Sequence, residues 1–393
     1  MKKILLPIIF LIVFSCEEQV KINLSEENHT KFERSAMLSS CGFITFPLDK
    51  ETGFRHRSMS IDSFDGNDYL SFINTLNNSI YIYEINAPNN LKKIELSKQG
   101  PDGVGGLSIA SHKLLSSDSI MLFNAMSANL FILDSKGQVI FKESLLDYKT
   151  IKREPNPEPS TLSPIIFKNN TVFMSGSFDS YLTDYSSSMT TISYNLETKE
   201  LDFIIPLSEI YNSGYWGEQF KYNPSLTYSQ KLDKLLVNYP IDPKISIVDF
   251  DGNKTDDFYE VNSLINEIKP LREDIEYGLE KDHSIRDPEQ YEYSLTNSDF
   301  RTIISDNYND LFYRIAYIRP STEEFKLGQK MTNSAISIIN SDFKKIGEKF
   351  FDSSKYDPSS ILVCKEGILI ARSDLYKTDE DNLTFELFKI IYK

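Results

Sequence analysis

Short runs of β-branched and aromatic residues, separated by polar turn residues, recur along most of the chain. Six of these runs resemble one another, in forms such as Ser79-Ile-Tyr-Ile-Tyr and Lys244-Ile-Ser-Ile-Val. This composition is typical of β-strands. The six segments are residues 79–85, 129–135, 190–196, 244–250, 335–341 and 384–390.

Each of these segments belongs to a larger unit of about four strands. Turn residues such as Asp134-Ser-Lys-Gly137 join a segment to the next strand, as expected for an antiparallel hairpin. Two further strand-like runs lie upstream, for example residues 224–228 and 234–239 before the segment at residue 244. The segments are spaced by 50, 61, 54, 91 and 49 residues, which indicates loop insertions and not missing strands.

Six such units predict an all-β fold, a six-bladed β-propeller of four-stranded antiparallel blades. The alternatives are a large β-sandwich or two separate β domains. The last unit lacks an outer strand before Lys393, so we expect an N-terminal strand, from residues 42–46 or 57–61, to complete it and close the ring. The expected propeller covers residues 41–393, with an inserted, partly helical loop at residues 260–300.

The connections between the expected strands differ in length on the two faces of the ring. When the strands of a blade are lettered A to D from the axis outward, the A–B and C–D connections are short, whereas many D–A and B–C connections are long. Binding residues concentrate on loops held by a rigid scaffold, so this long-loop face is the expected binding face. The alternative is neutral variation in loop length. In the largest insertion, residues 261–268 and 271–278 have helical spacing and are interpreted as a lid or as a solvated charged helix.

Five residues on the long loops are candidate ligand-binding residues. Trp216 is the only tryptophan, and Tyr215 precedes it between glycines. Exposed aromatic rings stack on sugars or peptides, but Trp216 is equally interpreted as packing between blades or plugging the channel mouth. Arg272 lies in the insertion, and Arg319 and Arg372 begin two other long loops. No motif for a catalytic residue, a metal ligand or a cofactor is present.

The N-terminus has the pattern of a bacterial lipoprotein signal. Lys2 and Lys3 precede an apolar run at residues 4–14, which is too short to span a bilayer but suits a signal peptide. Ser15-Cys16 then resembles a lipobox, in which the cysteine is lipidated after cleavage. We therefore expect a signal peptide at residues 1–15 and a lipid anchor with a polar tether at residues 16–40. The alternative is an ordinary secretory signal with an incidental cysteine.

Charge and cysteine content narrow the classes of partner. The formal net charge of −15 argues against nucleic-acid binding, so the expected partners are the membrane, through Cys16, and a glycan, peptide or envelope protein. Besides Cys16, the chain contains only Cys41 and Cys364. A disulfide between them would staple the ring, and the alternative is two separate thiols.

The lipobox, the six hairpins and the connection Gln99-Gly-Pro-Asp-Gly103 together resemble the TolB-like six-bladed propeller lipoproteins of Bacteroidota, many of which carry domains of unknown function. Glu17 and Glu18 resemble the surface-export signal of such lipoproteins, or else begin a solvated tether. The resemblance implies an outer-membrane lipoprotein on the periplasmic or cell-surface side. We expect a binding or scaffolding lipoprotein that holds its ligand on the long-loop face; the alternative is a propeller hydrolase or lyase acting on polysaccharide.

Overall fold

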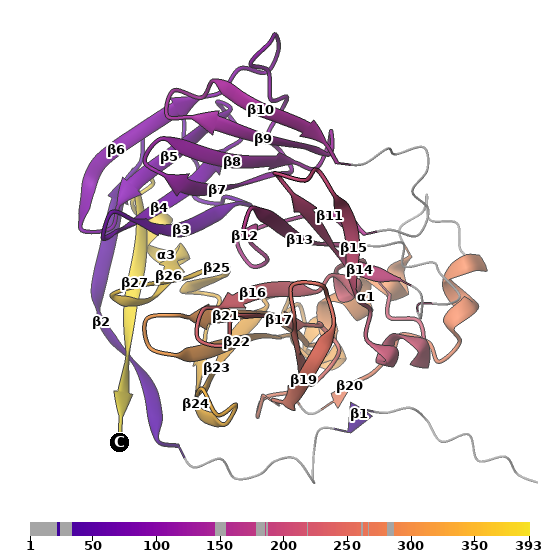
Figure 1. Cartoon of the computed structure of the whole chain (residues 1–393). Helices are drawn as coiled ribbons and strands as arrows, with labels where there is room; N and C mark the ends of the chain where they lie inside the picture. The colour runs from indigo at the N-terminus through magenta and orange to yellow at the C-terminus, as the bar shows by residue number, and fades with distance from the viewer. Residues whose placement is uncertain are drawn as a thin grey trace, which may run out of the picture.

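Six antiparallel sheets are arranged around one axis as the blades of a β-propeller (Figure 1). The structure is a computed structural model that describes residues 22–23, 34–145, 155–177, 185, 188–217, 219–260, 262–265, 267–280 and 287–393. The expected all-β fold with four-stranded blades is therefore confirmed.

The first three blades follow one another along the chain, each from its innermost strand outward. A short additional strand, β11 (Asn156–Pro157), also pairs with β13 in blade 3. The strands are β3 (Met59–Phe64), β4 (Asn67–Asn74), β5 (Ser79–Glu84) and β6 (Ala87–Glu95) in blade 1; β7 (Ala110–Ser116), β8 (Ser119–Asn124), β9 (Asn129–Asp134) and β10 (Val139–Ser144) in blade 2; and β12 (Ile166–Lys168), β13 (Thr171–Ser177), β14 (Met189–Asn195) and β15 (Leu201–Pro206) in blade 3.

Blades 4 and 5 repeat this order, and blade 6 takes its outermost strand from the other end of the chain. Each of the six segments recognised in the sequence forms the third strand of its blade. The strands are β16 (Ser225–Ser229), β17 (Lys234–Asn238), β18 (Lys244–Val248) and β19 (Lys254–Tyr259) in blade 4; β21 (Asp299–Asp306), β22 (Leu311–Ile318), β23 (Asn333–Ile339) and β24 (Lys345–Phe351) in blade 5; and β25 (Tyr356–Cys364), β26 (Gly367–Arg372), β27 (Asn382–Tyr392) and β2 (Ala36–Pro47) in blade 6.

The ring is closed by β2, which runs antiparallel to β27 from the pair Ala36–Tyr392 to the pair Pro47–Asn382 (Figure 1). Residues 42–46 thus supply the closing strand, as expected. Residues 57–61 instead lead into β3, the innermost strand of blade 1. Since β2 begins at Ala36, the sheet starts earlier than the expected boundary at residue 41.

Apolar side chains fill the spaces between neighbouring blades. The middle strands are buried on both faces, so β5 is buried along nearly its whole length, in contrast to the exposed outer strand β6. Where blades 6 and 1 meet, the Phe46 ring packs edge-on against Tyr83 and Phe385. The closing strand therefore contributes to the core and not only to backbone pairing.

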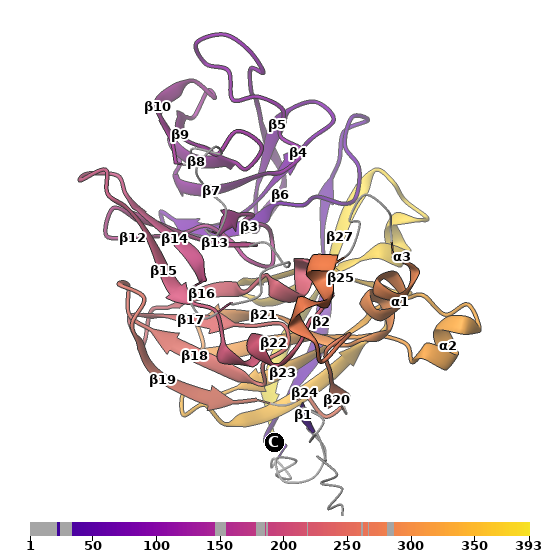
Figure 2. The ribbon, with the colours of Figure 1, turned by 90° about the vertical axis from the view of Figure 1, so that its right-hand side faces the viewer.

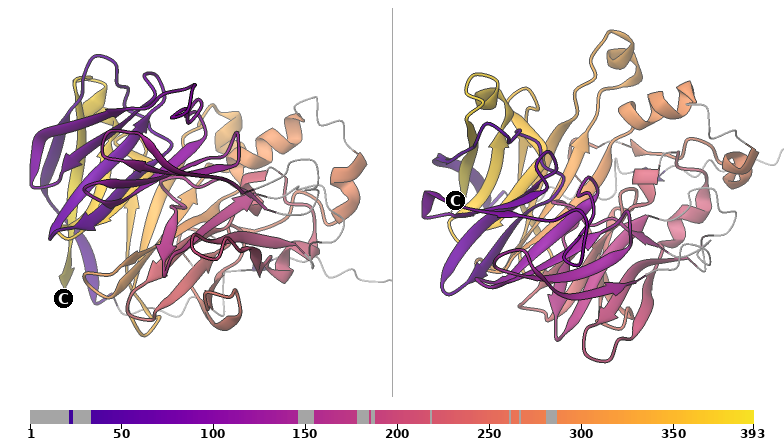
Figure 3. Two further views of the ribbon diagram at one scale, coloured as in Figure 1. Left: turned by 45° about the horizontal axis from the view of Figure 1, so that its top comes forward. Right: turned by 90° about the horizontal axis from the view of Figure 1, so that it is seen from above.

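The two faces of the ring differ as the connection lengths predict. Three short helices, α1 (Pro288–Thr296), α2 (Thr322–Lys326) and α3 (Ser373–Tyr376), all lie in D–A or B–C connections of the long-loop face. Helices α1 and α2 are neighbours (Figures 2 and 3). Their Tyr291 and Phe325 rings meet edge-on.

The expected helices of the insertion are largely wrong. Residues 267–268 form strand β20 (Glu267–Ile268), which pairs with β1 (Ile22–Asn23), and the second segment contains only a 3₁₀ turn, η3 (Ile275–Glu280). The α-helix comes later, where Asp287 caps the first turn and Pro288 occupies its first position. These two residues are a strong helix-start signal that outweighs apolar spacing.

The blade geometry excludes the possible disulfide between Cys41 and Cys364 and leaves the alternative of two separate thiols. Cys41 lies at a bulge in the outermost strand of blade 6, and Cys364 ends its innermost strand. Three strand spacings, about 14 Å, separate these positions, whereas disulfide-bonded Cα atoms lie within about 7 Å. Both thiols are free, Cys41 exposed and Cys364 buried.

The signal peptide, Cys16 and the acidic pair Glu17–Glu18 lie outside the described residues, so their roles stay predictions. Within the described ranges, no helix is long and apolar enough to span a membrane.

Candidate functional site

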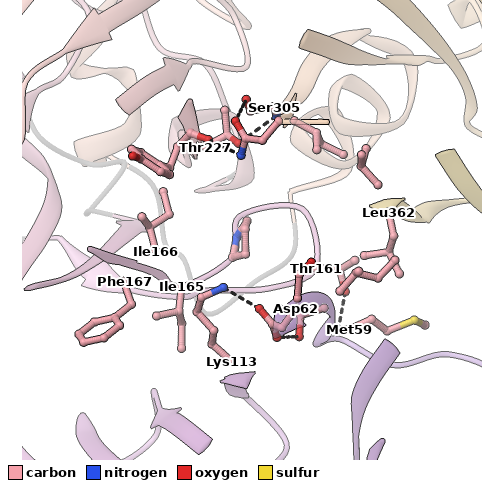
Figure 4. Close-up of a pocket in the computed structure, with 18 of the residues that line it drawn as sticks. Met59, Asp62, Lys113, Thr161, Ile165, Ile166, Phe167, Thr227, Ser305 and Leu362 are labelled. Carbon is pink, nitrogen blue, oxygen red and sulfur yellow. Dashed lines mark hydrogen bonds and ion pairs between the residues drawn. The ribbon is translucent and has the colours of Figure 1, made fainter. Parts of the chain in front are cut away.

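The six innermost strands surround a cavity of about 420 Å³ on the propeller axis (Figure 4). Its lining is mainly apolar, with side chains such as Ile61, Ile166 and Leu362. The main charged feature is the ion pair between Lys113 Nζ and Asp62 Oδ1, 2.6 Å apart. This axial cavity lies at the centre of the fold.

A strap of residues 158–163, which precedes β12, crosses the axis at the long-loop end of the axial cavity. Thr161 Oγ1 accepts a hydrogen bond from Met59 N of blade 1 at 2.9 Å. On the other side, Thr302 Oγ1 of blade 5 donates to Leu162 O at 2.5 Å. Thr161 lines the axial cavity and also the space above the strap, so the strap separates the two.

Above the strap, the long-loop face contains a second cavity of about 450 Å³, here called the cup. This volume is in the usual range for small-molecule sites. Thr161 and Leu162 of the strap line the cup as well. Every blade except blade 2 contributes to the wall or floor of the cup. The remaining lining residues are His56, Arg57, Glu158, Ser160, Phe220, Asn223, Arg301, Tyr317 and Ser359.

Arg301 is placed in the cup by a β-bulge in the inner strand of blade 5. Phe300 pairs with Ala316 and Thr302 pairs with Ile315, so Arg301 is an extra residue on its strand. Bulges of this kind redirect a side chain and are common next to active sites. Arg301 Nε is buried without a hydrogen-bond partner, and the guanidinium has no ion pair within the described part of the chain. The guanidinium lies 5.7 Å from the Tyr317 ring, and its Nε remains available to a ligand.

Asp299 is the carboxylate nearest to Arg301 in the sequence, and it forms ion pairs with two other cations. Its Oδ2 lies 3.0 Å from Lys221 Nζ and 3.1 Å from Arg319 Nη2. Burial opposes ionisation, but the nearby cations outweigh it and hold the pKa of Asp299 below its usual range. Burial also lowers the pKa of Lys221 to about 8. Asp299 stays ionised, with Oδ2 held by Lys221 and Arg319, while its Oδ1 is buried without a hydrogen-bond partner within the described residues.

The other ionisable groups that line the cup also have protein partners. Arg57 Nη2 lies 3.2 Å from Glu158 Oε2. His56 stacks on Phe72, and burial lowers the pKa of its ring to about 4. Its Nδ1 lies 3.1 Å from Ile73 O, so this nitrogen carries the proton of the neutral ring. At neutral pH His56 is therefore uncharged, and the charge around the cup comes from arginine, lysine and carboxylate groups.

The two aromatic residues predicted to stack on a ligand do not reach the surface. Tyr215 and Trp216 are both 0% exposed. Trp216 belongs to the core beside Tyr211 and Tyr222, and Tyr222 Oη accepts a hydrogen bond from Trp216 N. Burying the largest apolar side chain of the loop stabilises its attachment to the blades. The loop is anchored by Trp216, which corrects the ligand-stacking prediction.

The three predicted arginines are also engaged. Arg272 pairs with Glu289 and stacks on Tyr277 in the insertion. Arg372 pairs with Asp374 and Glu386 near α3. Arg319 lies behind the cup wall, where it holds Asp299. None of the three lines the cup, so these ligand-binding predictions are corrected to structural roles.

The insertion does not form a lid over the cup in the described part of the structure. Of its described residues between 260 and 300, none lines the cavity. Two of its charged residues, His283 and Arg286, lie outside the described residues.

Arg57, Asn223 and Arg301, three polar residues that line the cup, were not predicted from the sequence. A signal was available, because Arg57 and Asn223 each precede an inner strand by two positions and Arg301 is the third residue of another. In a propeller, the starts of the inner strands converge on the axis, so polar residues there face a common mouth. Within the described ranges, no cluster of three His, Cys, Asp or Glu residues is suited to holding a metal ion.

The fold and the site define a class: a six-bladed β-propeller with a ligand-sized polar cup on the axis of its long-loop face. The sequence matches DUF4221, a domain of unknown function, over residues 34–350. The chain therefore belongs to the DUF4221 family.

Solved structures support the fold. A DUF4221 family member from Bacteroides vulgatus is 21% identical, with a TM-score of 0.75 over 92% of this chain and 100% of that chain. A putative exported protein from Bacteroides fragilis is 10% identical, with a TM-score of 0.52 over 91% of this chain and 96% of that chain. At these identities the likeness shows the propeller alone. No curated protein matches the sequence.

Proposed function

We propose that this protein is an envelope-anchored binding lipoprotein that holds a ligand in the cup on the long-loop face of its propeller. The observation that carries the proposal is Arg301, whose guanidinium a bulge directs into the cup and whose Nε is buried without a hydrogen-bond partner within the described residues. A buried polar group without a partner is costly, and a ligand that pairs with it recovers that cost.

The geometry supports binding more than catalysis. General acid–base chemistry on a polysaccharide requires a carboxyl or histidine group that is free to exchange a proton. In the cup, Glu158 pairs with Arg57, and Asp299 nearby is held by two cations. His56 also lines the cup, but burial lowers the pKa of its ring to about 4, so it is a weak base at neutral pH. Pairs such as Arg57–Glu158 can position a ligand. Release of new reducing ends or unsaturated products from a polysaccharide would favour the hydrolase or lyase alternative.

The envelope location rests on the lipobox at Cys16 and on the relatives. One structural neighbour from Bacteroides fragilis is described as a putative exported protein. Lipid chains on Cys16 would provide a stable anchor, with the propeller held by the tether in the periplasm or at the cell surface.

The test is a ligand screen with a variant whose cup is filled. We expect a panel of neutral and acidic oligosaccharides, peptides and peptidoglycan fragments to contain at least one ligand that raises the melting temperature of the wild-type protein. Ser359→Trp, at an exposed position on the cup wall, should abolish that shift. Ser354→Trp is the matched control, because Ser354 is exposed on the preceding turn outside the cup.

Ligand binding that survives Ser359→Trp would place the site elsewhere on the propeller. A panel in which no compound changes the melting temperature would contradict a binding role.

A further inference from the structure

We propose that the cup recognises the carboxylate of an acidic sugar, a uronic acid residue of a glycan, with Arg301 as its anchor. This inference rests on the proposed function, since it names the class of ligand for the same cup. Three separate features of the cup support it: an unpaired donor, an unpaired acceptor and two aromatic walls.

The unpaired donor is Nε of the Arg301 guanidinium, a group whose only recorded contact within the described residues is with the Tyr317 ring, 5.7 Å away. It lies at the junction of the cup with a side recess of about 30 Å³, and Arg301 lines both. Such a recess holds about two water molecules or a group of carboxylate size. Arginine binds a carboxylate through two parallel hydrogen bonds, which fixes the position of the acid as well as its charge.

The unpaired acceptor is Asn223 Oδ1, which is buried without a hydrogen-bond partner. Asn223 lines the same two spaces as Arg301. An amide oxygen needs a donor, which a bare anion such as acetate lacks. A sugar acid supplies both groups, a carboxylate for Arg301 and hydroxyl donors for Asn223, and the hydroxyls of Ser160 and Ser359 line the same wall.

The aromatic walls are the rings of Phe220 and Tyr317. The Arg319 guanidinium lies 5.4 Å from the Phe220 ring and 5.8 Å from the Tyr317 ring, which positions both. An aromatic ring packs against the C–H face of a pyranose and excludes water from its polar edge. A peptide carboxylate has no such face, so these walls favour a sugar acid.

The local charge also favours an anion. The whole chain carries −15, yet the charged side chains at the cup include one more cation than anion. A narrow cavity of opposite sign to its ligand concentrates the field and raises the rate of association. The charged side chains that line the cup are Arg57 and Arg301 against Glu158.

The experiment is isothermal titration calorimetry of the full-length protein in detergent. The probes are trigalacturonic acid, its methyl ester, sodium acetate and inorganic phosphate. We expect the acid to bind about 10- to 100-fold more tightly than the ester, because a charged hydrogen bond contributes about 1.5–3 kcal/mol. Acetate and phosphate should bind far more weakly, since they make no contact with the aromatic walls.

The variants separate the role of Arg301 from net charge. Arg301→Gln should reduce the affinity for the acid to that for the ester, and Arg301→Lys should retain part of the difference. Arg55→Gln removes the same charge from an exposed position outside the cup and should have no effect. Circular dichroism of each variant verifies that it is folded.

Equal affinity for acid and ester, or full affinity in a folded Arg301→Gln variant, would overturn the inference. Phosphate bound as tightly as the sugar acid would identify a free-anion site instead. If neither sugar binds, the sugar assignment fails, whereas a shift by another compound that Ser359→Trp blocks would leave the cup as the binding site.

Discussion

His112 is a fully enclosed histidine in the wall between blades 1 and 2, only 2% exposed. Its Nδ1 lies 3.0 Å from Ser58 Oγ and its Nε2 lies 2.8 Å from Ser71 Oγ. One serine hydroxyl donates a hydrogen bond to the unprotonated ring nitrogen, and the other accepts one from the protonated nitrogen. Both nitrogens of the neutral ring therefore have a hydrogen-bond partner. Burial lowers the pKa of His112 to about 4.

This histidine should make the protein sensitive to acid. In the unfolded chain the ring takes up a proton near its ordinary pKa of 6.5, whereas the folded ring does so only near 4. Between these values the unfolded state binds more protons, so the stability falls as the pH falls from about 6.5 to 4, by up to about 3 kcal/mol. Urea unfolding at neutral pH and at pH about 4.5 measures this loss.

The control for this prediction is His112→Gln, which cannot titrate. We expect the variant to be less stable than the wild type at neutral pH, but to lose less of its stability on acidification. An equal loss in both proteins would show that other groups account for the pH dependence.

At the scale of elements, the closing strand β2 joins the two ends of the chain. Its inward side chain Phe46 is 0% exposed and contacts both blade 1 and β27, whereas Met37 on the same strand is 45% exposed. Both residues belong to the same backbone pairing of β2 with β27, but only Phe46 packs in the core. Substitutions at the two positions therefore distinguish the contribution of core packing from that of strand pairing.

We expect Phe46→Ala to lower the free energy of unfolding by about 3–5 kcal/mol, because it leaves a cavity between blades 6 and 1. Met37→Ala should change it by less than about 1 kcal/mol. Denaturant titration of both variants makes the comparison. A small effect of Phe46→Ala would mean that the stability of the propeller does not depend on core packing where β2 closes it.

Strands and helices were not equally predictable. The strands follow from local runs of β-branched and aromatic residues and from turn residues, so all six third strands were correctly predicted. Of the two segments considered for the closing strand, residues 42–46 form part of it and residues 57–61 do not. In the insertion, by contrast, apolar spacing at residues 261–268 indicated a helix, but residues 267–268 pair as a strand with residues 22–23. A partner more than two hundred residues away decided the conformation, and no local pattern contains that information.

At the scale of the whole molecule, the propeller is one acidic ring that we expect to be held at the membrane by Cys16. Removal of the signal would take Lys2 and Lys3 with it and change the formal net charge from −15 to −17. Such a surface is not attracted to anionic lipid, so attachment should depend on the lipid anchor.

Cys16→Ser should therefore move the protein from the membrane fraction to the soluble fraction and abolish labelling by a fatty-acid probe. Cys41→Ser is the control, because Cys41 is an exposed thiol on β2 that has no part in the lipobox. Membrane attachment that persists in Cys16→Ser would identify a different mode of anchoring.

The class of fold, the number of blades and the face with long loops could be predicted from the amino-acid sequence, and the closing strand was reduced to two candidate segments. These properties follow from patterns that lie along the chain, namely runs of β-branched and aromatic residues, turn residues and connection length. The site, in contrast, depends on the tertiary structure. Arg57, Glu158, Asn223 and Arg301 meet at the cup because ring closure brings the starts of distant inner strands to one axis, and a bulge directs Arg301 into it. Trp216 illustrates the converse, since its burial depends on the side chains that other blades place around it.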